Sequence, residues 1–300
     1  MSTDAVLREL LVRRLDHWLP AALHRARRAT LALAYGGGDA TGAEEALRVV
    51  AEFADRLRGR RLTVLVVADD GTDLPVRLGT AEAALPADVA VHLVPGGPDR
   101  LPVALKAAGA AGAPLLTVAD GADPDPALLA AAASGRPAEL LLVTAPGRSL
   151  RPALTDAGFP LVTEVELVPD GDGPARLLGY GTVSDHGLEA VKEALWAVDE
   201  YAGVRYRDPA DPQGRLLDIS LDPEPGPLRR ELLAELARSG PRTVTELRRF
   251  ATTATVYRAA DVNRALTSLL ASGAVTRDPE RGRLGGDVSI SAVPTAGSSA

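Results

Sequence analysis

Short apolar runs alternate with amphipathic, Ala-rich stretches over the first half of the chain. The runs are rich in Val and Leu with little polar interruption, the pattern of parallel strands that are buried on both faces. The stretches between them repeat their apolar positions every three or four residues, as helices do. The predicted strands are residues 30–35, 62–68, 89–94, 115–119 and 140–144. The predicted helices between them are residues 43–58, 76–85, 99–111 and 126–134.

These alternating units predict an α/β fold with an open, doubly wound parallel sheet. The crossovers of such a sheet are right-handed, and its ligands bind beyond the carboxyl ends of the strands. Before the first strand, residues 4–28 form a predicted helix with an apolar stripe of Leu and Trp and a kink at Pro20. We expect this helix to cover an edge or a face of the sheet.

The pattern changes after the fifth strand. Residues 161–168 and 175–183 are two further predicted strands, joined by a connection rich in Gly, Asp and Pro. Such a connection favours an antiparallel hairpin. A parallel sheet that ends in an antiparallel hairpin is typical of class I methyltransferase folds, which are Rossmann-like. A predicted helix over residues 187–198 follows the hairpin.

A second, smaller domain follows a Pro-rich linker. Residues 228–238 and 259–272 predict helices, and Thr243 with Glu246 predicts a capping box at the start of a short helix between them. Two short strands, residues 274–277 and 287–292, predict a wing hairpin, which completes a winged helix-turn-helix. The predicted organisation is a methyltransferase-like domain over residues 1–200, a linker over 201–227, a winged helix over 228–293 and a disordered tail over 294–300.

Composition excludes several kinds of function. The chain has no cysteine, which excludes disulfides and Cys-based zinc or iron–sulfur sites, and its four histidines are scattered. We therefore expect no metal site. No apolar stretch reaches the roughly 20 residues of a membrane span, and the first residues lack the apolar core of a signal peptide. These features predict a cytoplasmic protein with no membrane interaction.

The charge of the chain is unevenly distributed. A formal net charge of -7 opposes simple polyanion binding. Residues 222–300 carry 11 Arg and 9 acidic residues, net +2, whereas residues 1–221 carry 22 basic and 31 acidic residues, net -9. Arg outnumbers Lys so strongly that genomic base composition is the simplest cause, so Arg enrichment alone does not indicate phosphate binding.

A Gly-rich loop and one acidic residue are the candidates for cofactor binding. Gly36, Gly37 and Gly38 lie between a predicted strand and a predicted helix, where a methyltransferase-like sheet holds S-adenosylmethionine. Asp69 follows the second strand, where an acidic side chain commonly binds ribose hydroxyls. All four residues are also ordinary components of tight turns, so both interpretations stay open.

Asp120, at the end of the fourth strand, is the candidate catalytic residue, because it could orient an amine substrate. Only 3% of the residues are aromatic, so few side chains could stack on a nucleobase, which disfavours base methylation. The chain has neither a Gly-x-Ser-x-Gly motif nor a Gly-x-x-x-x-Gly-Lys-Ser/Thr loop, which disfavours a hydrolase or a triphosphate site. Asp185 and His186 fit the start of a helix better than an acid–base pair.

Residues 185–199 read Asp-His-Gly-Leu-Glu-Ala-Val-Lys-Glu-Ala-Leu-Trp-Ala-Val-Asp. This run resembles the end of the sheet domain in the three-Cys-motif partner proteins (TcmP), which read His-x-Leu-x-x-(Met/Val)-Lys-Glu-Ala-(Met/Leu)-Trp-x-Val-Asp there. The likeness is carried by His186, Gly187, Leu188, Lys192, Glu193, Ala194, Trp196, Val198 and Asp199. The opening helix and the tail, which looks like a GMT-like winged helix, are similar in layout to the same family.

The chain departs from the family at two positions that carry chemistry. Ala32 stands in the first strand where such proteins have an acid that meets the methionine end of S-adenosylmethionine. After Asp120, Gly121 and Ala122 stand where they have Pro and Phe. The resemblance with these departures implies a non-catalytic partner or adaptor protein that binds no cofactor. Its partner would be a three-Cys-motif protein of radical-SAM or phage-related type.

Two alternatives remain. The first is an S-adenosylmethionine-dependent methyltransferase that uses the Gly-rich loop, Asp69 and Asp120. The second is a DNA-binding regulator whose winged helix contacts phosphates, and the same surface would otherwise meet a protein partner. The basic residues proposed for that nucleic-acid or partner surface are Arg248, Arg249, Arg258, Arg264 and Arg283.

Overall fold

A computed structural model of the protein describes residues 2–37, 40–69, 73–169, 171, 173–202, 204–217 and 226–293, with the backbone alone at residues 199–202. The chain forms two compact units, Met1–Leu217 and Asp218–Ala300. The first unit thus continues past residue 200, where the sequence predicted its end. The predicted disordered tail, residues 294–300, lies outside the described residues.

The first unit is a mixed α/β structure around a nine-stranded sheet of order β3-β2-β1-β4-β5-β7-β6-β8-β9. The five predicted parallel strands are confirmed, and β1 pairs in parallel with both β2 and β4. Every residue of β1 after its first is buried, as an apolar strand between two helical layers requires. The parallel strands are β1 (Arg28–Tyr35), β2 (Arg61–Ala68), β3 (Val89–Pro95), β4 (Leu115–Asp120) and β5 (Ala138–Thr144).

The predicted antiparallel hairpin is also confirmed. Strands β6 (Leu161–Pro169) and β7 (Arg176–Thr182) pair antiparallel, and β7 lies between β5 and β6. Two strands that the sequence did not predict, β8 (Val204–Arg207) and β9 (Leu216–Leu217), extend the sheet beyond β6. They occupy the first part of the predicted linker, which therefore belongs to the first unit.

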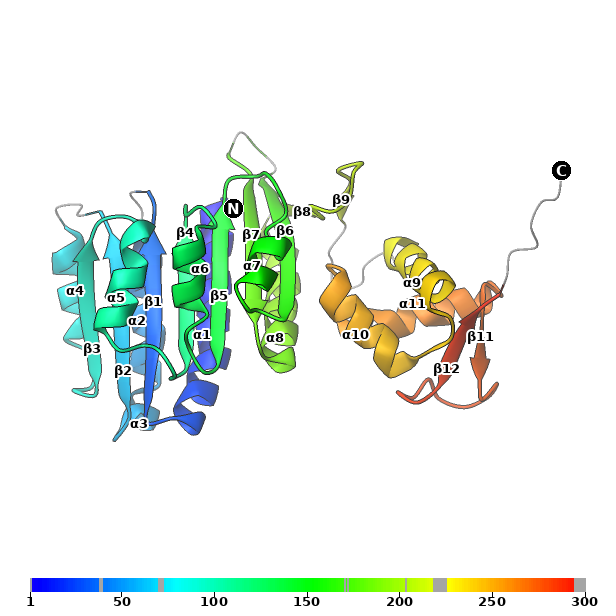
Figure 1. The fold of residues 1–300 in the computed structure, drawn as a ribbon, viewed down its shortest axis with the longest axis horizontal. Helices are drawn as coiled ribbons and strands as arrows, with labels where there is room; N and C mark the ends of the chain where they lie inside the picture. Colours follow the sequence, from blue (N-terminus) through cyan, green and yellow to red (C-terminus); the bar gives the residue numbers. More distant parts are fainter. Residues whose placement is uncertain are drawn as a thin grey trace. The chain divides into compact units, whose positions relative to one another are not determined.

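Helices cover both faces of the sheet (Figure 1). On one face α1 packs against α2 and α8, and α2 packs against α4; on the other, α6 packs between α5 and α7. The bounds are α1 (Thr3–Arg25), α2 (Thr41–Glu52), α3 (Ala54–Leu57), α4 (Leu74–Glu82), η1 (Pro98–Arg100), α5 (Leu101–Ala107), α6 (Pro126–Ala132), α7 (Arg151–Asp156) and α8 (Asp185–Ala202). None of the helices in the described part of the chain is long and apolar enough to cross a membrane.

Three features of these helices differ from the sequence prediction. The predicted helix over residues 43–58 is divided into α2 and α3 at Phe53. Helix α1 continues through Pro20 and ends at Arg25, before the predicted end. Helix α7 was not predicted, and its start is stabilised by a distant residue: the buried Glu164 carboxylate of β6 accepts from the backbone N–H groups of Leu150 and Arg151 at 2.8 and 3.2 Å.

In its described residues, 226–293, the second unit contains three helices and a three-stranded sheet of order β10-β12-β11. The predicted capping box is confirmed, since the Thr243 hydroxyl accepts from the Glu246 N–H and the Glu246 carboxylate accepts from the Thr243 N–H. Gly273 ends the third helix with a φ of +69°, a conformation that favours glycine. The bounds are α9 (Gly226–Ser239), β10 (Arg242–Thr243), α10 (Val244–Ala254), α11 (Ala259–Ala271), β11 (Val275–Asp278) and β12 (Ser289–Ala292).

A buried polar network joins α1 to the sheet. The Arg14 guanidinium donates through Nε to Oε2 of Glu139 at 2.9 Å, and its NH2 group forms an ion pair with the same oxygen. The Tyr180 hydroxyl donates to that oxygen at 2.7 Å. All three side chains are buried, and burial followed by the nearby Glu139 carboxylate raises the pKa of Tyr180 well above its ordinary value. The network therefore fixes the position of α1 over β5 and β7.

We predict that Glu139→Gln destabilises the first unit by about 3–5 kcal/mol, because the substitution leaves the buried Arg14 charge uncompensated. Urea denaturation followed by tryptophan fluorescence measures this unit alone, since both tryptophans, Trp18 and Trp196, belong to it.

The matched control is Glu9→Gln, which breaks the exposed Glu9–Arg13 pair of the same helix and should cost less than about 1 kcal/mol. Equal losses in the two variants would contradict the role given to the network.

Candidate functional site

The structure brings three of the predicted site residues together at the carboxyl ends of β1 and β4. Gly36 and Gly37 follow β1, and Asp120 is the last residue of β4. The Gly36 N–H donates to the Asp120 carbonyl at 2.7 Å. A Cβ atom on Gly36 would lie 2.3 Å from the carbonyl oxygen of Gly121. The glycine at position 36 is thus required by the close approach of two backbones.

Of the other predicted cofactor-binding residues, one does not line the cavity described below and one is not described. Asp69 follows β2, is exposed, and is not among the residues that line the cavity described below. Gly38 lies outside the described residues. Ala32, where a methyltransferase would have an acid, is fully buried in the apolar core, paired with Leu65 and Thr117 on the neighbouring strands. Of the predicted cofactor-binding residues that the structure describes, Gly36 and Gly37 therefore line the cavity and Asp69 does not.

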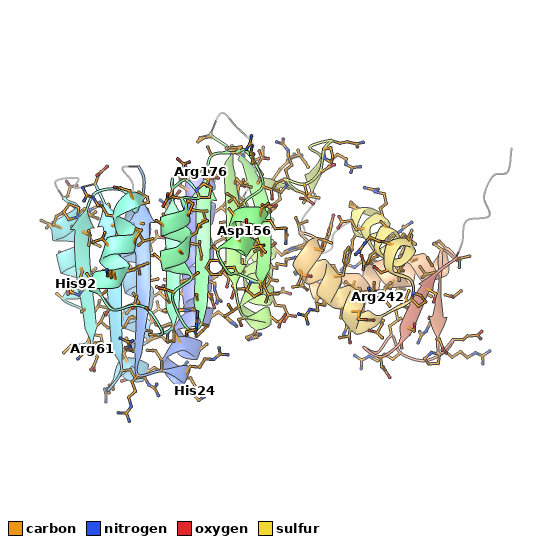
Figure 2. The ribbon with its side chains drawn as sticks, in the orientation of Figure 1. His24, Arg61, His92, Asp156, Arg176 and Arg242 are labelled. Carbon is orange, nitrogen blue, oxygen red and sulfur yellow. The ribbon has the colours of Figure 1, made fainter. Side chains whose placement is uncertain are left out.

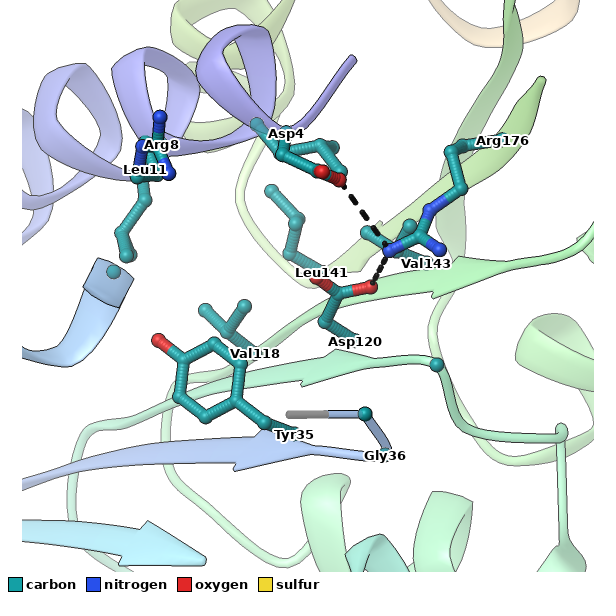
Figure 3. A pocket seen from close by; sticks show the side chains of 14 residues that line it. Asp4, Arg8, Leu11, Tyr35, Gly36, Val118, Asp120, Leu141, Val143 and Arg176 are labelled. Carbon is teal, nitrogen blue, oxygen red and sulfur yellow. Dashed lines mark hydrogen bonds and ion pairs between the residues drawn. The ribbon is translucent and has the colours of Figure 1, made fainter. Parts of the chain in front are cut away.

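A cavity of about 310 Å³ lies beside Gly36 and Asp120, between α1 and the sheet. Figure 3 shows the first turns of α1 on one side of it and the ends of β1 and β4 on the other. Most of the lining is apolar, from Leu7, Leu11, Val118, Leu141 and Val143. The polar lining side chains are Asp4, Arg8, Tyr35, Asp120 and Arg176.

Arg176 lies between two carboxylates at one end of this cavity. The Nη2 atom of Arg176 is 2.6 Å from Oδ1 of Asp120 and 3.8 Å from Oδ1 of Asp4 (Figure 3). Burial raises the pKa of Asp120 above its ordinary value, although the Arg176 guanidinium acts in the opposite direction. Arg176 is the first residue of β7 and lies at the edge of the sheet where the parallel strands end. Arg61, at the start of β2, lies at the other edge of the sheet (Figure 2). The Asp120 carboxylate therefore forms an ion pair with Arg176.

Four polar residues of the lining are not among the site residues predicted from the sequence: Asp4, Arg8, Tyr35 and Arg176. Asp4 and Arg8 lie one helical turn apart, which is the signal that would have placed them on one face of α1. Arg176 begins a strand directly after a turn, where a charged residue is ordinary. Its pairing with Asp120 depends on the position of β7 beside β5, which local sequence does not specify.

In the second unit, two of the predicted surface arginines have internal roles. The Arg258 guanidinium donates to both carboxylate oxygens of the buried Asp261, through Nε at 3.2 Å and NH2 at 2.9 Å. Arg248 donates to the Asn263 side chain at 3.1 Å and so links α10 to α11. Arg249, Arg264 and Arg283 are exposed. Of the five predicted surface arginines, these three are thus the exposed ones.

His186, which was weighed above as part of an acid–base pair with Asp185, packs against another histidine. His186 lies in the first turn of α8, and its ring centroid is 4.6 Å from that of His17 on α1. Burial, then the charges of Arg14 and His186, lower the pKa of His17 below its ordinary 6.5, with Glu139 acting in the opposite direction. Among the described residues no three His, Asp or Glu side chains form a cluster that could hold a metal ion.

Comparison of the sequence with protein-family models gives no match, and comparison with curated proteins gives none either.

We predict that His17 contributes to a loss of stability at acidic pH. Because the folded state binds this proton less tightly than the unfolded chain, the contribution of His17 is complete above pH 6.5 and is lost as the pH falls below that value. The free energy of unfolding, measured at about pH 7.5 and about pH 5.5, should therefore fall less in His17→Gln than in the unsubstituted protein. His24→Gln, at an exposed position of the same helix, is the control; an equal effect there would refute the assignment.

Proposed function

We propose that the chain is a TcmP-like partner or adaptor protein, with a methyltransferase-like first unit that does not catalyse methyl transfer. The strand order β3-β2-β1-β4-β5-β7-β6 with a reversed β7 supports the methyltransferase-like assignment of this unit. Its helix α8 contains the run of residues 185–199 that resembles the three-Cys-motif partner proteins.

The observation that carries the non-catalytic assignment is the pairing of the Asp120 carboxylate with Arg176 at the ends of the strands. A doubly wound sheet binds its ligand where the chain leaves adjacent strands toward opposite faces, here between β1 and β4. At that point the Gly36 N–H bonds to the Asp120 carbonyl, and Gly36 has no room for a Cβ atom beside Gly121. The Asp120 side chain is bound by Arg176, and Ala32 stands where the family has an acid. These residues do not fit S-adenosylmethionine.

The arrangement of the second unit supports a winged helix that acts as a docking module. Three helices are followed by the β11–β12 hairpin, whose connecting loop is stabilised by Arg277: its guanidinium donates to the carbonyls of Pro279 and Gly282, each at 2.9 Å. Arg248 and Arg258 bind within the unit, which removes two of the five arginines that the sequence predicted for DNA phosphates. A protein partner is therefore favoured over duplex DNA.

By resemblance, the partner is a three-Cys-motif protein of radical-SAM or phage-related type. Such a partner would supply metal chemistry that a chain without cysteine cannot supply through thiolates. The exposed Arg249, Arg264 and Arg283 are the residues we assign to the contact surface.

We predict that calorimetric titration of the full chain with S-adenosylmethionine or S-adenosylhomocysteine gives no binding heat, because Ala32 stands where the family has an acid and Asp120 is paired with Arg176. Binding in the micromolar range would contradict the proposal. Weaker binding in Asp120→Asn but not in Asp123→Asn, an exposed residue of the same loop, would then favour the methyltransferase alternative.

We further predict that affinity purification of the tagged protein from its source cells recovers a three-Cys-motif protein, and that Arg249→Glu and Arg264→Glu each weaken the recovery. Arg230→Glu, an exposed position on α9, provides the same change of charge as a control. Arg258 is unsuitable for this test, because its loss would leave the buried Asp261 unpaired. Recovery of nucleic acid without such a protein would favour the DNA-binding alternative.

A further inference from the structure

The cavity beneath α1 has an apolar body and one polar end. Leu7 and Leu11 of α1 face Val118 of β4 and the β5 residues Leu141 and Val143 across it. An apolar lining with a small number of polar groups at one place is the usual composition of a small-molecule site. The volume of about 310 Å³ lies near the lower end of the range for such sites, which indicates a compact ligand.

The polar end carries more negative than positive charge. Two carboxylates, those of Asp4 and Asp120, share the single guanidinium of Arg176. The contact with Asp4 is long, at 3.8 Å, and Asp120 is bound by Arg176 through one oxygen, Oδ1. The carboxylate oxygens at this end can therefore accept further hydrogen bonds. Because the site is partly buried, a second cation would be attracted to them more strongly than in bulk water.

Both cations of the lining contact carboxylates, although the Arg176 Nε atom has no hydrogen-bond partner among the described residues. Arg8 is 3.7 Å from Oε1 of Glu45, and Arg176 contacts two carboxylates. An anionic ligand would have to compete with these contacts and would lie near Asp4 and Asp120. The charge distribution thus disfavours a simple carboxylate or phosphate at this place.

We propose that this cavity binds a small organic ammonium ion with an apolar body, whose nitrogen donates hydrogen bonds to Asp120 and Asp4 and whose body packs on Val118, Leu141 and Leu11. Both plain amines and free α-amino acids carry this group, so the shared feature is the ammonium. The inference does not depend on the partner proposed above, because the cavity belongs to the first unit and the residues assigned to the partner belong to the second. It also concerns a molecule much smaller than S-adenosylmethionine.

Three compounds with the same branched apolar body provide the test: 3-methylbutylamine, leucine and 4-methylpentanoate. Titration of the full chain, followed by calorimetry or by NMR of the ligand, should detect binding of 3-methylbutylamine and none of 4-methylpentanoate. If leucine binds as well, amino acids are the natural class; if it does not, plain amines are. Equal binding of 4-methylpentanoate, or no binding of the amine below about 10 mM, would overturn the proposal.

Two variants test the placement of the ligand. Asp120→Asn should weaken binding of 3-methylbutylamine about tenfold or more, because a charge-assisted hydrogen bond is lost, whereas Asp123→Asn in the same loop should leave it unchanged. Gly37→Leu places a side chain at the cavity, and a Cβ atom there meets nothing within 4 Å, so it should reduce binding without a clash at that atom. Far-UV circular dichroism checks that each variant is folded. Unchanged affinity in either folded variant would refute the site.

These results separate the present inference from the proposed function. Amine binding that depends on Asp120, with no response to S-adenosylmethionine, supports both. Absence of amine binding with no response to S-adenosylmethionine removes this inference and leaves the non-catalytic assignment intact.

Discussion

The position of α1 depends on one buried ionic contact, and much of the first unit depends on α1. Arg14 and Glu139 are both removed from water, and such a pair is tolerated only when each charge is well compensated. A helix held by this contact cannot slide or rotate by one residue without leaving a charge unpaired. The contact thereby fixes Leu7 and Leu11 over the sheet, and these side chains close one side of the cavity.

The same helix combines two kinds of environment along its length. Near its start, Asp4 and Arg8 lie at the cavity, where ion pairs are partly exposed. Farther along, Arg14, His17 and Trp18 meet Glu139, His186 and the core. Helix α1 thus packs against the core over β5 and lines the cavity at the ends of β1 and β4. The sheet keeps a small cavity at the ends of β1 and β4 for this reason.

Local sequence predicts those parts of the fold that local chemistry determines. The five parallel strands follow from uninterrupted Val and Leu, and the start of α10 follows from the spacing of Thr243 and Glu246. Helix α7 was missed because its N-terminus is capped by Glu164, which lies on another strand. Of the candidate site, Gly36 and Asp120 were placed correctly at adjacent strand ends, but Arg176 was missed, since its contact with Asp120 joins residues far apart in sequence.

The two short strands after α8 decide where the first unit can be cut. Tyr206 of β8 is fully buried, and its hydroxyl donates to the carbonyl of Leu195 on α8 at 2.9 Å. A fragment truncated at residue 200 would lack Tyr206 and so leave its place in the core empty. The outer side of β6, which pairs with β8, would then carry unpaired backbone groups. Exposed strand edges of that kind promote intermolecular pairing and aggregation. An autonomous first unit therefore requires the chain through Leu217, although the sequence from residue 201 reads as a linker.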